Sequence, residues 1–480
     1  MKNIMEWRVF ATVLFSLVLL AACNGKAHAT GGSSVINQQA AFSNDIFRIT
    51  NSGRYIFSGE YVGQILIEAT RNDVVELVLD GMTIHNPNGP AILALRSGRV
   101  ELILSDRTTN TISDGRHSND ETNAAIYIRH DLIISGNGTL NVNGNYRHGI
   151  RAQDFLTING GIINVTAAGD ALRGRDGVTV ENGVFTLIAG GDGIRSNRAS
   201  DLERGFITIN GGTFTIEAGD DGIQAETTVT INGGNFRITA KDDGITTKGS
   251  VLITGGTINI LDCYEGIEGL NVTITGGDIN IIARDDGINA REHGAGAGSA
   301  VRGRAMTRTP LNDNIFIRIT GGNINIHAIH GDGIDSNGHL FLDGGTVKIT
   351  GPFNRPGEDA IDLDGIFTVT GGELITAGSV RSVSPQSTQP VLLVSYDRQF
   401  PSGALIEVKD TRGAVLLNHT AQNTFVASGF TSPGFAIGGT YSIYINAEKV
   451  NDITLTGMVT NIGTAGGRGG RMNQPRLPRP

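Results

Sequence analysis

Carboxylates recur along this chain at a spacing that could hold cations. An acid, then a small residue and then isoleucine or leucine return about every 22 residues. The acids of this repeat are Asp170, Asp192, Asp221, Asp243, Glu265, Asp286, Asp332 and Asp359. A second acid precedes several of them, at Asp220, Asp242, Asp285 and Glu358. Ca²⁺ takes six to eight oxygen ligands without strict geometry, so stacked acids of this kind are candidate calcium ligands.

The counter-charges for these acids change along the chain. Three residues after the repeat position, the early units carry Arg151, Arg173 and Arg195. The later units carry neutral or acidic residues there, namely Gln224, Thr246, Glu268, Asn289, Asp335 and Asp362. Like charges on neighbouring strands repel each other, so the later acids need another source of positive charge. The bases that remain near them, and that could contact an anionic ligand, are Lys241, Lys248, Arg284 and Arg291.

The loss of arginine predicts calcium binding between residues 220 and 362. The candidate ligands are Asp220, Asp221, Asp242, Asp243, Glu265, Asp285, Asp286, Asp332, Asp335, Asp359 and Asp362. An alternative needs no metal, because an aspartate can simply accept hydrogen bonds from backbone N–H groups at its bend. The histidines lack metal-ligand spacing, and neither a phosphate-binding loop nor a Ser–His–Asp set is recognisable.

The regular spacing of the acids requires a repeating fold. Sustained self-similarity at a period near 22 residues is typical of a solenoid. Within a unit, runs such as Val229–Ile231 and Phe236–Ile238 alternate apolar and polar residues, and Gly233-Gly234 separates them. A period of two indicates strands, and glycine suits bends that need positive φ. The sequence therefore predicts an all-β fold, a right-handed parallel β-helix with 22-residue coils.

The segments outside the repeat are assigned from their composition. Residues 1–22 are typical of a lipoprotein signal peptide, because Leu20-Ala21-Ala22-Cys23 matches a lipobox. We therefore expect lipidation at Cys23 and an extracytoplasmic, membrane-anchored lipoprotein. The expected order is then a tether (23–44), the β-helix (45–383), a small C-terminal β module (384–461) and a disordered tail (462–480).

The charge of the chain excludes one class of partner. Its formal net charge is −9, whereas a surface that binds nucleic acid needs a basic stripe. We therefore expect no nucleic acid partner, and contact with a membrane only through the lipid anchor. Cys263 has no partner in the mature chain and is expected to be a buried apolar residue.

The chain resembles a known family, the secreted calcium-binding and carbohydrate-binding β-helix proteins of cellulolytic anaerobes, which are distantly similar to pectate lyases. The resemblance covers roughly residues 45–460. Besides the repeat it rests on Leu77–Ile84, Asp131–Tyr146, Gly331–Gly338, Gly357–Gly365 and Ser428–Tyr444. It implies a right-handed β-helix, bound Ca²⁺ and binding of plant cell-wall polysaccharide, either polygalacturonate or a cellulose-like glycan. The metal ligands would come from the acids of the repeat.

Three functions follow from these observations. We expect a monomeric cell-surface lipoprotein that binds an acidic, pectin-like polysaccharide through Ca²⁺ and is not an enzyme. The first alternative is a calcium-dependent pectate lyase, in which Lys241, Lys248 or Arg291 would act as the base. The second is a structural surface protein or adhesin.

Overall fold

The computed structural model describes residues 34–35, 45–115, 120–292 and 311–463. The predicted signal peptide, Cys23, most of the tether and nearly all of the predicted tail lie outside these residues. The described part consists mainly of strands, with one short 3₁₀ helix, η1 (Asp120–Thr122). Within it, no helix has the length and apolar character needed to cross a membrane.

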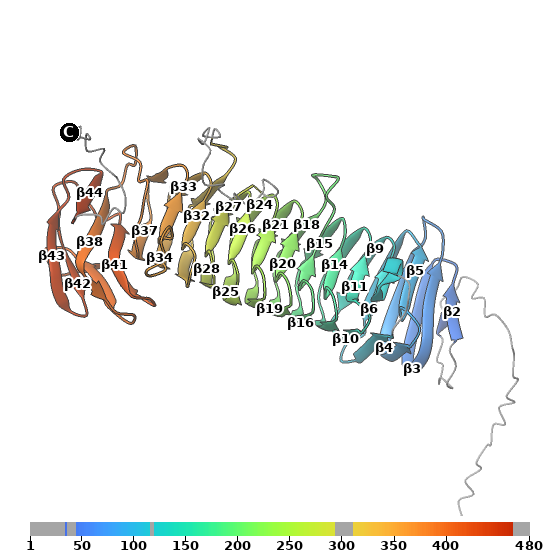
Figure 1. Ribbon diagram of the computed structural model, residues 1–480. Coiled ribbons are helices and arrows are strands. Elements are labelled where there is room, and N and C mark those ends of the chain that lie inside the picture. Colours follow the sequence, from blue (N-terminus) through green and yellow to red (C-terminus); the bar gives the residue numbers. More distant parts are fainter. Residues whose placement is uncertain (1–33, 36–44, 116–119, 293–310, 464–480) are drawn as a thin grey trace, which may run out of the picture.

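Each regular coil contains a short, a middle and a longer strand. In one coil these are β20 (Ile223–Ala225), β21 (Thr228–Ile231) and β22 (Asn235–Ala240). Each strand pairs in parallel with its equivalent in the next coil, as Ile223 does with Ile245. The coils stack along one axis (Figure 1), so three parallel sheets surround a single core. This arrangement confirms the predicted parallel β-helix.

The first sheet contains the short strands, and each acid of the repeat lies just before the start of its short strand. Its strands are β2 (Asp45–Ile49), the end of β3 (Gly53–Glu68), β5 (Ile92–Arg96), β8 (Ala124–Ile128), β11 (His148–Ala152), β14 (Leu172–Gly174), β17 (Ile194–Arg195), β20, β23 (Ile245–Thr247), β26 (Ile267–Gly269), β29 (Ile288–Ala290), β32 (Ile334–Ser336) and β35 (Ile361–Leu363). β3 also pairs with β1 (Ser34–Val35).

The second and third sheets complete each coil. The second contains parts of β3 and β4 (Val74–Asn86), then β6 (Arg99–Leu104), β9 (Asp131–Gly136), β12 (Phe155–Ile158), β15 (Gly177–Val180), β18 (Phe206–Ile209), β21, β24 (Ser250–Ile253), β27 (Asn271–Ile274), β30 (Phe316–Ile319), β33 (His339–Leu342) and β36 (Phe367–Val369). The third contains the end of β4, then β7 (Thr109–Asp114), β10 (Thr139–Gly144), β13 (Ile162–Ala167), β16 (Val184–Ala189), β19 (Thr213–Ala218), β22, β25 (Thr257–Cys263), β28 (Asp278–Ala283), β31 (Asn323–Ala328), β34 (Thr346–Thr350) and β37 (Glu373–Ala377).

Identical residues stack in columns inside the helix. The ring centres of Phe185 and Phe214 lie 4.5 Å apart and those of Phe214 and Phe236 lie 4.6 Å apart, and in both pairs the rings are stacked and nearly parallel. The isoleucine or leucine two positions after each acid is also buried, as at Ile223 and Ile245. Burial of this apolar residue fixes where the acid stands, because the two are separated by only one residue.

Glycine serves two different purposes in each coil. At the turn between the second and third strands Gly212 and Gly234 have φ of 109° and 107°, as the sequence predicts. The glycine of the acidic repeat does not have a positive φ. A Cβ on Gly222 would instead lie 2.5 Å from the Gly244 carbonyl oxygen and 2.6 Å from Ile238 Cγ2. Close approach of two coils therefore excludes a side chain at Gly222.

A small β module covers the far end of the helix (Figure 1). β41 (Phe425–Thr431) pairs antiparallel with β37 and with β38 (Val391–Phe400), and β44 (Val459–Ile462) pairs with β38. A separate antiparallel sheet contains β40 (Val415–Thr420), β39 (Leu405–Lys409), β42 (Thr440–Ile445) and β43 (Glu448–Thr454). The two layers enclose a second apolar core. The predicted small β module is confirmed as a fold element.

Candidate functional site

The acids of the repeat form a hydrogen-bonded column, which we call the acidic ladder. From Asp170 to Glu265, and again from Asp286 to Asp359, a carboxylate oxygen accepts the backbone N–H of the equivalent acid one coil later. Four of these bonds measure 3.0–3.2 Å, from the N–H of Asp192 to Asp170, Asp221 to Asp192, Asp243 to Asp221 and Glu265 to Asp243. The series continues with Asp332 to Asp286 at 2.7 Å and with Asp359 to Asp332.

These bonds bear on the alternative interpretation, in which the aspartates only accept backbone N–H groups and bind no metal. The aspartates do accept backbone N–H groups, but those of the next coil and not those of their own bend. The Oδ1 atom of Asp221, for example, is used in this way by Asp243. The ladder therefore holds neighbouring coils together. The second carboxylate oxygen of each acid can contact a different group.

In the first half of the ladder, arginines neutralise the acids. Arg173 lies 3.0 Å from Asp170, and Arg195 lies 2.7 Å from Asp192. Each pair joins residues three apart, which confirms the basic column expected from the sequence. Arg151 differs, because its guanidinium bonds the Asn123 side chain and lies 5.5 Å from the Tyr127 ring centre.

From Asp192 onward, carboxylates gather beside the ladder. Three groups bring carboxylate oxygens within 4.8 Å of one another. We name them the upper cluster (Asp192, Asp220, Asp221), the middle cluster (Asp243, Glu265, Glu268) and the lower cluster (Asp286, Asp332, Glu358). Oxygen donors this close together match the ligand type and spacing that a hard divalent cation requires.

The middle cluster is the most deeply buried of the three. Asp243 is 8% exposed, Glu265 is 3% exposed and Glu268 is fully buried. One guanidinium reaches it, because Arg291 lies 2.6 Å from Glu268 Oε2 and 3.7 Å from Glu265 Oε1. Three carboxylates therefore face a single positive charge. If all three ionise, the cluster retains a buried negative charge, which is costly in a protein interior.

An asparagine completes the middle cluster. Asn289 is 3% exposed, and its Nδ2 donates to Glu265 at 3.1 Å and to Asp286 at 3.3 Å. Its Oδ1 has no hydrogen-bond partner among the described residues. A buried amide oxygen without a partner is unfavourable, and amide oxygens are also good ligands for Ca²⁺. The Oδ1 atom of Asn289 therefore adds an available metal ligand beside the carboxylates.

Burial makes these acids difficult to ionise without a cation. It raises the pKa of Asp243 to about 7 and that of Asp221 to about 8, and neighbouring carboxylates add to the effect. Burial likewise raises the pKa of Asp286 to about 7. The pKa values of Glu265 and Asp332 are also raised, first by burial and then by nearby acids. A bound divalent cation would favour the charged forms and reverse these shifts.

The predicted ligands divide into two sets. Those that lie in a cluster are Asp220, Asp221, Asp243, Glu265, Asp286 and Asp332. Outside the clusters, Asp242 is exposed, Asp285 lies beside the Tyr264 hydroxyl group and raises the pKa of Tyr264, and Asp335 pairs in register with Asp362 in the first sheet. Arg381 contacts Asp359 and lies 3.9 Å from Asp362.

The predicted ligand set omits Asp192, Glu268, Glu358 and Asn289. A signal for Glu268 was present, because the Asp170–Arg173 and Asp192–Arg195 pairs show that a residue three positions later reaches the acid. Glu268 stands at that position relative to Glu265. Replacement of arginine by glutamate there turns an ion pair into a carboxylate pair.

The four predicted basic residues have different surroundings. Lys248 lies 2.7 Å from Glu226, and Arg284 lies 3.6 Å from Asp262. The Lys241 side chain is exposed. Arg291 alone among the four contacts a carboxylate cluster.

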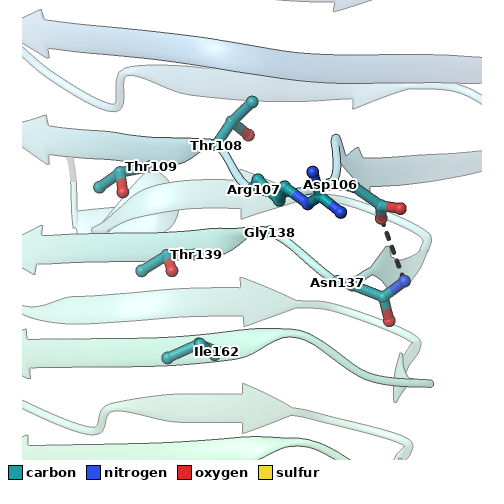
Figure 2. Close-up of a pocket in the computed structure, with 8 residues that line it drawn as sticks. All are labelled: Asp106, Arg107, Thr108, Thr109, Asn137, Gly138, Thr139 and Ile162. Atoms are coloured by element: carbon teal, nitrogen blue, oxygen red, sulfur yellow. Dashed lines mark hydrogen bonds between the residues drawn. The ribbon is translucent and has the colours of Figure 1, made fainter.

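A depression of about 330 Å³ lies on a different corner of the helix (Figure 2). Figure 2 shows Asp106 and Asn137 joined by a 3.0 Å hydrogen bond at its edge, with Thr109, Thr139 and Ile162 along its floor. None of the predicted ligands lines it. It is therefore separate from the acidic ladder.

Comparisons with known proteins point to carbohydrate binding. The family model described as carbohydrate-binding domain-containing protein matches residues 43–293 and again residues 238–452. A carbohydrate-binding domain-containing protein of Acetivibrio thermocellus is 32% identical over 184 residues, which are 33% of this chain and 64% of that protein. The chain thus matches less than two thirds of the length of this relative.

A solved structure shares part of the sequence. It is described as the polysaccharide lyase-like protein from C. thermocellum, in a gadolinium derivative. The match has 33% sequence identity and a TM-score of 0.43, and it covers 45% of this chain and 91% of that one.

Proposed function

The chain belongs to the family of carbohydrate-binding domain-containing proteins, and we propose that it binds an acidic, pectin-like polysaccharide through Ca²⁺ held on the acidic ladder. The observation that carries this proposal is the middle cluster. Asp243, Glu265 and Glu268 are buried within 4.8 Å of one another and share one arginine. A cation bound there would offset charge that the protein itself leaves unbalanced.

The donor set suits calcium better than a transition metal. The clusters consist of carboxylates, and Asn289 adds an amide oxygen, whereas zinc sites in proteins contain cysteine or histidine, with a carboxylate at most as an additional ligand. Asp243, Glu265, Glu268 and Asn289 would hold the ion in the middle cluster. When bound, Ca²⁺ supplies open coordination positions for the carboxylates of a uronate chain. Arg291 would contact the same anionic chain directly.

The surroundings of the bases favour binding without catalysis. A lyase needs an unprotonated base close to the proton that it removes from the uronate. Lys248 is paired with Glu226, and Arg291 with Glu268, and neighbouring carboxylates raise the pKa of Arg291 further. Both bases are therefore already engaged by carboxylates of the protein. We propose a binding protein, and a calcium-dependent lyase remains the second candidate.

We also propose where the protein is located in the cell. A lipid on Cys23 would attach a monomer to the outside of the membrane through the segment 23–44. The elongated helix would then present the acidic ladder to polysaccharide outside the cell.

Affinity electrophoresis tests the proposed function. The protein should be retarded in a native gel that contains polygalacturonate and millimolar Ca²⁺, but not in the same gel with a chelator. Glu268→Gln should weaken the retardation, because it removes one carboxylate from the middle cluster. Glu226→Gln is the matched control, since Glu226 pairs with Lys248 outside the clusters. Equal mobility with and without polymer in both gels would refute the proposal.

One further measurement separates binding from cleavage. Incubation with polygalacturonate and Ca²⁺ should produce no ultraviolet absorbance from unsaturated uronate. Sustained growth of that absorbance, abolished by Lys248→Ala or Lys241→Ala, would favour the lyase.

A further inference from the structure

An aromatic residue interrupts the row of acids beside the ladder. Tyr264 precedes Glu265 at the position that Asp220, Asp242 and Asp285 occupy in the neighbouring coils. Its backbone is bonded like theirs, because its N–H donates to the Asp242 carbonyl at 2.7 Å and its carbonyl accepts the Asp285 N–H at 2.9 Å. The coil therefore keeps its path, and only the side chain changes.

The Tyr264 ring faces solvent. Tyr264 is 46% exposed, and every other phenylalanine or tyrosine in the described part of the chain is less exposed than this. The Asp285 carboxylate beside the hydroxyl group raises the pKa of Tyr264 to about 12. Exposure of an aromatic face beside charged groups is unusual, because such a face is normally covered by apolar packing.

The ring lies next to the middle cluster. Glu265, the following residue, is one of its three carboxylates, and Asn289 bonds Glu265 while leaving its own Oδ1 without a partner in the described chain. A cation site and a flat apolar surface therefore adjoin each other on one edge of the helix. A uronate unit has both matching parts, a carboxylate and an apolar ring face made of C–H groups.

We propose that Tyr264 is the residue on which a sugar ring of the polysaccharide stacks while the carboxylate of that polysaccharide reaches the cation of the middle cluster. The inference rests on the proposed function and names a contact that the calcium ligands alone do not supply. Stacking would select a pyranose chain over other polyanions, because a flexible polycarboxylate offers no ring to cover Tyr264. Tyr264 would thus contribute specificity, and the carboxylates would contribute cation-dependent affinity.

Two substitutions at this position separate stacking from folding. Tyr264→Phe keeps the ring and removes the hydroxyl group. Tyr264→Asn removes the ring but places a polar residue where neighbouring coils carry Asp242 and Asp285, so the coil should still form. Leu202→Asn is the control for loss of an exposed apolar side chain, because Leu202 is 89% exposed and lies outside the clusters.

The dissociation constant for polygalacturonate, measured by affinity electrophoresis in Ca²⁺, is the readout. We expect Tyr264→Phe and Leu202→Asn to bind like the unaltered protein, and Tyr264→Asn to bind about tenfold more weakly. All variants should keep the same increase in melting temperature on addition of Ca²⁺, and none should change weak binding to polyacrylate. Equal binding of Tyr264→Asn and the unaltered protein would overturn the inference alone. Failure of the unaltered protein to bind in Ca²⁺ would overturn it together with the proposed function.

Discussion

The backbone N–H of Asp243 donates a 3.0 Å hydrogen bond to Oδ1 of Asp221, one coil earlier. The same Asp221 carboxyl has its pKa raised to about 8, mainly because it is buried. One side chain therefore fixes the stacking of two coils and also carries an electrostatic cost. The ladder repeats this combination, so the acids that join the coils are also those that a bound cation would stabilise in the charged form.

Two substitutions at Asp221 separate these effects. Asp221→Ala leaves the Asp243 N–H without its acceptor and should cost about 1–3 kcal/mol. Asp221→Asn keeps an acceptor and removes the charge, so it should melt at or above the temperature of the unaltered protein in chelator at pH above 8. Calorimetry in chelator measures both. Equal destabilisation by the two variants would show that the hydrogen bond is not what matters.

The raised pKa values also predict a dependence on pH in chelator. An acid with a raised folded-state pKa holds its proton more tightly in the folded state, so stability falls as pH rises toward that pKa. For Asp243 and Asp286, with pKa raised to about 7, and for Asp221, with pKa raised to about 8, the fall begins above the ordinary value of 3.8, continues through pH 6.5 and ends just above the raised value. Burial lowers the pKa of His148 to about 3 and that of His419 to about 4, so both add stability as pH rises toward their ordinary value of 6.5 and little above it.

Ca²⁺ should reduce this dependence, since it binds the ionised carboxylates. We expect the melting temperature to fall from pH 6.5 to 8.5 in chelator and to fall less in millimolar Ca²⁺. A melting temperature in chelator that rises over this range would contradict the assigned shifts.

Gly222 should not tolerate a side chain. A Cβ there would lie 2.5 Å from the Gly244 carbonyl oxygen, and neither backbone can move without displacing a coil. Gly222→Ala should therefore destabilise the protein by about 1–3 kcal/mol. Gly457→Ala serves as the control, because nothing lies within 4 Å of its added Cβ. Thermal melting of the two variants provides the comparison, and equal melting temperatures would show that the coils can separate at little cost.

Cys23 provides a test of the location. Cys23→Ser should prevent lipidation and release the protein from the membrane fraction. Fractionation followed by mass spectrometry of the N-terminal peptide would detect both changes. Unaltered membrane association of Cys23→Ser would mean that another feature holds the protein there.

The sequence predicts the helix well because its coils are nearly identical. The 22-residue spacing, the apolar columns and glycines such as Gly234 each repeat, so one coil describes the others. The first coils are harder to predict, since β3 is a 16-residue strand that passes through all three sheets. Its length interrupts the periodic signal on which the prediction depends.

The sequence repeat predicts only part of the candidate site. Column positions identify Asp243 and Glu265, but the approach of Glu268 depends on where its side chain points from the first sheet. The Asp221–Asp243 bond joins different coils, so no local turn pattern reveals it. Glu358 precedes its own repeat acid by one residue and nevertheless joins the cluster of Asp286 and Asp332 from earlier coils.

Calcium titration of chelator-treated protein by isothermal calorimetry tests the central claim most directly. For the unaltered protein, the heat of each Ca²⁺ injection should fall to zero once a defined number of ions is bound per chain. The double substitution Asp243→Asn with Glu268→Gln should lose at least one binding event, because it removes two of the three carboxylates of the middle cluster. Glu226→Gln should lose none. Absence of calcium binding by the unaltered protein, or identical stoichiometry in the double variant, would contradict the assignment of the acidic ladder as a cation site.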